Sequence, residues 1–462
     1  MKYLVLIIAI SLNLNNVIAQ DSNYVLDLNN YLDLILKSHP IAQNADLSIE
    51  LADAKLLKSK GNFDPKLDLG IDQKYFDGKD YYSNSVAQIN VPIWYGPKIK
   101  AGYELNDGTF LNDQNTVPDQ GLAFLGLSLP LGRGLFYDSR RYEQQSAEIF
   151  QNAASFEKQK ILADLFFRAR VRYFEWQGDF RTIQVLNQIS GLAAKRFDFV
   201  KQSYSAGDLP AIDTLESFVQ YKNRIIDANK QIAKYKNKIA KLSALISFDP
   251  DFQTIISNLS PINNFNLPDT INLKELIVNI NEQNPEIRLL LADLNSSNLN
   301  QRLAKENLKP NLELSYNILN NGNDYYALGT YSENNYKWNL DFQFPIFLRK
   351  ERGELQKTSV KIKQTENKLA EKKAEIQFKL NGILNQISDL LPVLDEFQAL
   401  SLNYRQLLDS EFIKYQVGDS SLFKVNTREN KLIEIEVKRI ELQIEVNKLE
   451  AEFFNIAGIT GI

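Results

Sequence analysis

The stretch FVKQSYSAGDLPAIDTLE (residues 199–216) decides how the chain folds, because its pattern returns as FIKYQVGDSSLFKVNTRE (residues 412–429). Both copies begin with Phe-x-Lys, contain Gly-Asp and end on Thr-x-Glu. A long helical pattern leads into each copy, and a second helical pattern leads out of it. We interpret each stretch as the tight turn of a helical hairpin. Two unrelated hairpins are the alternative.

The Gly-Asp pairs give these turns their expected geometry. Gly207 and Gly418 stand where the end of a helix favours a left-handed residue, which glycine adopts without a Cβ penalty. Asp208 and Asp419 follow them directly, and we expect each carboxylate to cap the helix that comes next.

The composition excludes several kinds of chemistry. The 462 residues include no cysteine, so disulfides, thiolate metal sites and a cysteine nucleophile are excluded. His39 is the single histidine, which leaves almost nothing for a histidine metal site or a Ser/His/Asp triad. The net charge of −4 gives no basic field for nucleic acid. We therefore expect no enzyme activity, no metal and no cofactor.

The first 19 residues have the pattern of a secretory signal peptide. Lys2 precedes an apolar run, and Val17-Ile18-Ala19 fits a small-residue cleavage site. A genuine N-terminal helix is the alternative. A membrane-spanning helix needs about 20 consecutive apolar residues, and no later segment of the sequence approaches that length. Integration into a membrane would therefore require β-strands.

Two long segments repeat the same order of elements. In the first repeat, 20–246, the pattern predicts helices, strands within about 65–131, a long helix at 138–205, the turn at 206–210 and a helix at 211–246. Its four alternating runs lie near 67–71, 85–94, 99–105 and 122–131. After a linker at 247–269, the second repeat, 270–462, is predicted to contain a helix, strands within about 310–345, a long helix at 350–415, the turn at 416–421 and a helix at 422–457.

The repeat has further landmarks. Asn284-Pro285 matches His39-Pro40, and Pro310 matches Pro65 ahead of the strands. Apolar residues recur every seven positions along the long helices, which is typical of coiled-coil seams. The first half also carries extra residues between its strands, enough for one additional hairpin. The fold class is therefore mainly α, with paired long hairpins and a small number of β-strands.

These elements suggest a shared β-barrel. Four or six strands cannot close a barrel in a membrane, since bacterial single-chain barrels begin at about eight strands. Open sheet edges are not tolerated in lipid, so strands from several copies of the chain would have to join in a symmetric ring. Helices of roughly 100 Å would project from that barrel and form a tube.

With these features the sequence resembles the TolC-like outer-membrane efflux channels. The resemblance rests on the two-fold repeat, the Asn/His-Pro helix starts, the Pro-x-Leu-x-Leu strand starts, Pro130 before Gly132-Arg133-Gly134, and the two glycine turns. It implies a homotrimer with a β-barrel in outer-membrane lipid and an α-helical barrel in the periplasm. It also implies that the turns close the tube and dock a periplasmic adaptor (membrane fusion) protein, which connects to an inner-membrane pump or ABC transporter.

The resemblance also implies roles for single residues. Asp213 and Tyr415 match positions that link neighbouring hairpins in the closed state. The alternatives are a solvated or helix-capping carboxylate for Asp213 and a seam aromatic for Tyr415. Lys424 and Thr427 stand where the family has an acidic ring in the pore, and Ser420 replaces an arginine, so a cation preference is not expected here.

Aromatic residues near the strands suit a belt at the membrane interface, with ordinary strand packing as the alternative. They are Tyr75, Tyr81, Tyr82, Trp94, Tyr95, Tyr103, Tyr325, Tyr326, Tyr331, Tyr336 and Trp338. The rival to a channel is a secreted coiled-coil structural or adhesive protein. That rival explains the heptads but not the strands between helices in both halves.

Overall fold

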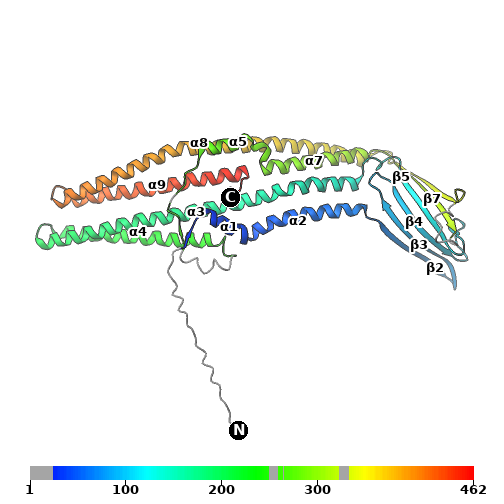
Figure 1. The fold of residues 1–462 in the computed structure, drawn as a ribbon, viewed down its shortest axis with the longest axis horizontal. Coiled ribbons are helices and arrows are strands. Elements are labelled where there is room, and N and C mark those ends of the chain that lie inside the picture. Colours follow the sequence, from blue (N-terminus) through cyan, green and yellow to red (C-terminus); the bar gives the residue numbers. More distant parts are fainter. Residues whose placement is uncertain (1–23, 249–258, 264, 322–331, 462) are drawn as a thin grey trace, which may run out of the picture.

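The computed structural model describes residues 24–248, 259–263, 265–321 and 332–461. The expected signal peptide lies outside these residues, as do Tyr325, Tyr326 and Tyr331 of the expected aromatic belt. The molecule is an elongated rod of paired helices with one antiparallel sheet at its end (Figure 1). This confirms the expected fold class.

The described residues form long helices, a set of strands and short connecting elements. The helices are α1 (Leu28–Ser38), α2 (Pro40–Lys60), α3 (Ser139–Ala206), α4 (Ala211–Ser243), α5 (Thr270–Val278), α6 (Ile280–Gln283), α7 (Pro285–Glu306), α8 (Arg349–Gln416) and α9 (Leu422–Ala457). The strands are β1 (Tyr24–Leu26), β2 (Lys66–Phe76), β3 (Lys79–Pro92), β4 (Lys98–Asp107), β5 (Leu122–Pro130), β6 (Leu259–Pro261), β7 (Asn311–Asn321) and β8 (Tyr336–Gln343). Short 3-10 turns, η1 (Gly61–Phe63) and η2 (Asp113–Asn115), complete the set.

The helices α3 and α8 set the length of the rod. Each has 68 residues, which at 1.5 Å per residue is about 100 Å. The helix α4 folds back along α3, and α9 folds back along α8, so each half forms one hairpin at the end away from the sheet (Figure 1). The helices α2 and α7 pack on the other ends of α3 and α8 and lead to the sheet. Among the described helices, none combines the length and apolar composition needed to cross a bilayer.

The two halves start their sheet-directed helices in the same way. His39 caps α2 by accepting the Ile41 N–H at Nδ1 over 3.1 Å, and Asn284 caps α7 by accepting the Glu286 N–H. A proline occupies the first turn in both helices, where its missing N–H costs nothing. His39 is buried, with its ring edge-on to Phe248, so this cap lies inside the rod.

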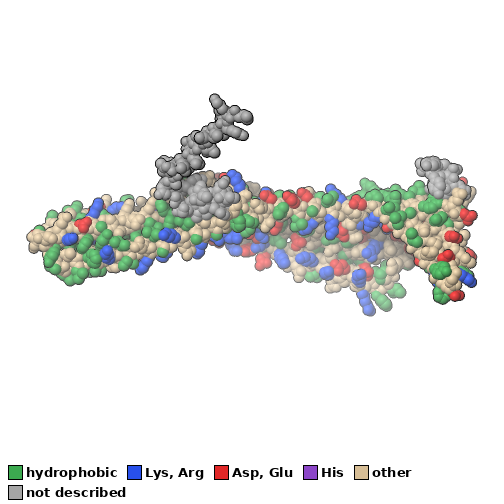
Figure 2. Space-filling view, turned by 90° about the horizontal axis from the view of Figure 1, so that it is seen from below, with side chains coloured by type: hydrophobic (Ala, Val, Ile, Leu, Met, Phe, Trp, Pro, Cys, Tyr) green, Lys and Arg blue, Asp and Glu red, His purple; other side chains and the backbone are tan. Residues whose placement is uncertain are grey.

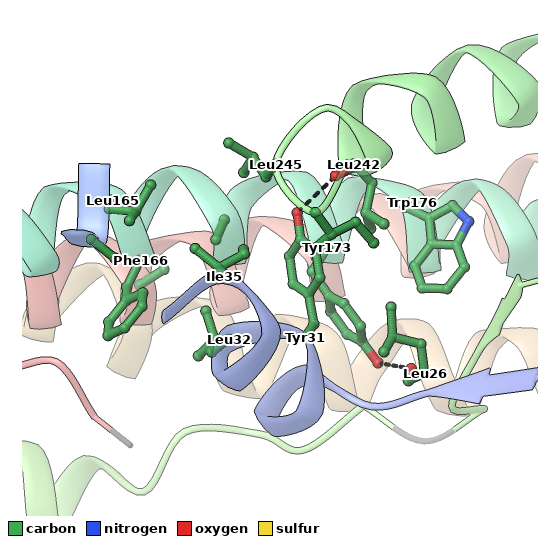
Figure 3. Packing of buried hydrophobic residues seen from close by; sticks show 14 of the residues in the cluster. Leu26, Tyr31, Leu32, Ile35, Leu165, Phe166, Tyr173, Trp176, Leu242 and Leu245 are labelled. Atoms are coloured by element: carbon green, nitrogen blue, oxygen red, sulfur yellow. Dashed lines mark hydrogen bonds between the residues drawn. The ribbon is translucent and has the colours of Figure 1, made fainter. Parts of the chain in front are cut away.

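A hydrophobic cluster fixes the middle of the rod (Figure 3). Tyr31 of α1 and Tyr173 of α3 lie at its centre and donate their hydroxyls to the Leu242 and Leu26 carbonyls, over 3.3 and 2.9 Å. The strands β1 and β6 form a small parallel pair beside this cluster. These two strands and the helices α5 and α6 were not predicted, because three- to nine-residue elements carry too little periodicity.

All six long strands form one sheet, in the order β2-β3-β4-β5-β7-β8 and with antiparallel neighbours. The first half supplies four of these strands and the second half two, so the additional hairpin belongs to the sheet. The segment 75–84, expected to separate two strands, is in fact the end of the β2–β3 hairpin. Asp77 and Gly78 both have positive φ there, and Asp-Gly is the sequence signal that should have identified the turn.

Candidate functional site

The two turns at the free end of the rod have the same backbone geometry. Gly207 and Gly418 are left-handed, with φ of 88° and 85°, which confirms the prediction for both residues. In each turn the glycine N–H donates to the carbonyl three residues back, and the next N–H donates to the carbonyl five residues back. This is the Schellman arrangement, which satisfies the last carbonyls of a helix.

The expected capping by Asp208 and Asp419 is wrong. The N-cap of α4 is Pro210 and the N-cap of α9 is Ser421, and neither cap residue makes a side-chain bond to its helix. Each aspartate comes two residues before the N-cap and contributes its backbone N–H to the Schellman turn instead. Their role in docking an adaptor stays a prediction.

The two hairpins pack against each other through an apolar cluster near these turns. Val200 of α3 and Val425 of α9 are fully buried in it, together with Leu422. The Phe199 ring of the first hairpin meets Phe412 and Tyr415 of the second edge-on, with centroids 6.2 and 6.1 Å apart. Within one chain the two hairpins therefore behave as a packed pair rather than as separate arms.

A buried ionic cluster adds to this contact. Glu429 of α9 is fully buried and accepts from Arg196 of α3 and from Arg224 of α4, each over 2.7 Å. Both arginines are themselves more than nine-tenths buried. One carboxylate thus joins both helices of the first hairpin to the second. Removing one partner of such a buried group typically costs about 3–5 kcal/mol.

The predicted bond between Asp213 and Tyr415 is not formed in this structure. Tyr415 is buried, and its hydroxyl has no hydrogen-bond partner among the described residues. Burial, with the nearby carboxylates of Asp213 and Glu216, raises the pKa of the Tyr415 phenol to about 12, so it remains a donor. Glu216 instead accepts from Asn426 over 3.0 Å. Asp213 lies in the first turn of α4, where the helix dipole favours an anion. The gate role of the pair stays a prediction.

Lys424 is exposed in the first turn of α9, and whether it lines a pore stays a prediction. Beside it, Ser420 donates to Glu411 across the second turn. This hydrogen bond, and then the charges of Arg428 and Lys424, hold the pKa of the Glu411 carboxyl below its usual value. The residue at the family's arginine position therefore closes the turn of its own hairpin.

Apolar side chains gather at the end of the rod that carries the turns (Figure 2). Ile212 and Leu215 of α4 are 65% and 59% exposed, while Val417 and Phe423 of the second turn are 69% and 71% exposed. Apolar side chains exposed this far and grouped at one end of a molecule are typical of an interaction surface.

The sheet at the other end of the rod has two chemically different faces. Along β2, Leu67, Leu69 and Ile71 point to one side and are 65%, 71% and 80% exposed. The pairing register continues this apolar face across every strand. Its members include Ile89, Ile99, Leu125, Leu127, Tyr316, Tyr336, Trp338, Leu340 and Phe342, all exposed. The opposite face carries charged and amide side chains, and its base is hollowed by a cavity of about 570 Å³.

The strands β2 and β8 end the sheet, and no strand among the described residues pairs with their outer edges. No group of three or more histidine, cysteine, aspartate or glutamate residues in the described ranges could hold a metal ion.

Sequence reasoning missed the buried arginine–glutamate cluster, although a signal existed. Leu422, Glu429 and Glu436 follow one another at seven-residue spacing in α9. A carboxylate at a position that the heptad reserves for an apolar side chain indicates a buried charge with a partner. Glu436 has this environment too, since it accepts from Ser401 and Arg405 of α8.

The structure is similar to solved outer-membrane channels over nearly its whole length. VceC of Vibrio cholerae superimposes with a TM-score of 0.66 at 13% identity, over 93% of this chain and 96% of that protein. CmeC of Campylobacter jejuni superimposes with a TM-score of 0.63 at 15% identity, over 93% of this chain and 85% of that protein. MtrE of Neisseria gonorrhoeae, solved in its open state, superimposes with a TM-score of 0.60 at 13% identity, over 94% of this chain and 89% of that protein. No family model matches the chain, and no curated protein has a similar sequence. The chain has the fold of these channels.

Proposed function

We propose that three copies of this chain form an outer-membrane channel that serves as the exit duct of a tripartite efflux or type I secretion system. The observation that carries the proposal is the sheet. Its exposed apolar face suits lipid, while its polar face suits a water-filled lumen. A coiled-coil protein without a pore would have no use for such a face.

The number of strands supports assembly from several copies. Six strands are fewer than the about eight that close the smallest bacterial barrels, and open edges are not tolerated in lipid. Three six-stranded sheets would reach the size of barrels with about 16–18 strands, which enclose an aqueous channel. The β2 edge of one copy would pair with the β8 edge of the next.

The free end of the rod supports a gated contact with partners. The apolar side chains around the two turns would dock a periplasmic adaptor, which would connect the duct to an inner-membrane pump or ABC transporter. The gate would lie at these turns, which form the free end of the rod, where hairpins of neighbouring copies would converge (Figure 1). Opening would require the adaptor to bind the open turns more tightly than the closed ones.

The test uses the full-length chain expressed in a bacterium with an outer membrane. An integral channel should stay in the outer-membrane fraction after alkaline washing, give a mass of about three chains in mild detergent, and conduct ions in planar bilayers. A chain released by alkali as a monomer, without conductance, would refute the proposal and favour the secreted coiled-coil alternative.

A further inference from the structure

One row of paired residues on the polar face crosses the whole sheet and carries three lysines. The lysine row consists of Lys66 on β2, Lys100 on β4 and Lys337 on β8. Between them the register places only uncharged residues, namely Asn90, Gly126 and Asn317. Side chains in one row of a sheet point to the same face, so the three ammonium groups belong to one band.

The cavity of about 570 Å³ lies at this band, where the sheet meets α3. Lys66, Lys98 and Lys100 line it from the strands, and Arg133 lines it from the loop after β5. The Arg133 N–H donates to the Pro310 carbonyl over 2.8 Å, which fixes the loop against the start of β7. The positive groups therefore converge on one concave surface from two parts of the chain.

Most of this positive charge is uncompensated. Within the described residues, Lys66, Lys100 and Arg133 have no ion pair or side-chain hydrogen bond, whereas the acids nearby are engaged. Glu313 accepts from Ser128 and lies 3.9 Å from Lys98.

The count of charged residues in the lining gives the sign of the cavity. Five cations line it, Lys66, Lys98, Lys100, Arg133 and Arg140, against two carboxylates, Asp138 and Glu313. A concave surface with spare charge of one sign concentrates the counter-ion.

We propose that the lysine row and Arg133 form a binding site for multivalent oxyanions in the wall of the lumen. The lysines would act as point charges and the Arg133 fork as a two-point donor toward phosphate- or carboxylate-type groups. The inference rests on the proposed channel and names its cargo class: solutes that carry more than one negative charge.

The experiment measures block of single-channel current by inorganic pyrophosphate. Lys66→Gln/Lys100→Gln removes two charges from the row. The control Lys74→Gln/Lys79→Gln removes two charges from the same β2–β3 hairpin at its far turn. The row variant should raise the half-blocking concentration of pyrophosphate roughly tenfold, which corresponds to the loss of about one hydrogen bond to a charged group. The control variant should match the wild type.

The outcomes separate the two proposals. Normal conductance with equal block in both variants would overturn the anion site and leave the channel intact. A trimer without conductance would overturn the channel instead. Calorimetric titration with pyrophosphate would then decide the anion site with the same two variants, since weakened binding in the row variant alone supports it and equal binding refutes it.

Discussion

Replacing Glu429 by glutamine tests whether the buried ionic cluster holds the two hairpins together. Glutamine has nearly the same shape and keeps one acceptor, so the substitution removes mainly the charge. The Arg196 guanidinium, 2.7 Å from the carboxylate, would then be buried without a counter-charge among the described residues, while Arg224 would keep only the half-exposed Asp227, 3.8 Å away. Removing one partner of a buried ion pair typically lowers the free energy of unfolding by about 3–5 kcal/mol. Because glutamine keeps one acceptor, we expect a loss of about 3 kcal/mol.

Hydrogen exchange of the purified protein in mild detergent measures this effect locally. A loss of about 3 kcal/mol corresponds to roughly hundredfold faster exchange through local opening of α3, α4 and α9 near the turns. The control is Glu434→Gln on the same helix, whose carboxylate pairs with Lys431 and Lys438 but is 42% exposed. Ion pairs of an exposed carboxylate contribute little to stability, so exchange should change far less than in Glu429→Gln.

A third variant separates charge from packing. Arg196→Met together with Glu429→Gln removes the Arg196 charge that position 429 no longer balances, so exchange should slow again relative to Glu429→Gln alone. Equal exchange rates in Glu429→Gln and Glu434→Gln would refute the claim that the buried cluster joins the hairpins.

Three further predictions concern the turns, the gate and the cap of α2. Gly207→Ala and Gly418→Ala should each lower the free energy of unfolding by about 1–2 kcal/mol in denaturant titrations, because alanine is strained at their positive φ. An added Cβ meets no atom within 4 Å at either position, so no steric clash contributes. The control Gly191→Ala, inside α3 and equally unobstructed, should stabilise by about 0.5–1 kcal/mol. Asp213→Ala with Tyr415→Phe should raise single-channel conductance if the pair closes the gate; unchanged conductance removes it from the gate. Burial lowers the pKa of the His39 imidazole in the folded protein. The neutral imidazole therefore contributes fully to the stability of the fold above the unfolded pKa of about 6.5, and this contribution is lost as pH falls through the lower folded pKa. His39→Asn, which copies the Asn284 cap of the second half, should remove that part of the acid sensitivity in thermal unfolding, and an unchanged pH profile would contradict this.

The sequence predicted what depends on local pattern. Glycine followed by aspartate marked both turns, and heptads marked the helices, because left-handed geometry and helix periodicity are properties of neighbouring residues. The error at Asp208 and Asp419 shows the limit. Whether a carboxylate caps a helix depends on where that helix begins, and Pro210 and Ser421 take the position instead.

The parts that could not be predicted depend on which segments meet in space. The alternation in β2 shows that Lys66 and Leu67 face opposite sides, but only the register places Lys66 in one row with Lys100 and Lys337. A shift of one residue in any pairing would move one of these lysines to the apolar face. If the apolar face meets lipid, as proposed, a charge on it would be costly, so burial of that face in lipid would favour the observed register. The exposed apolar face and the lysine row are therefore two consequences of one pairing.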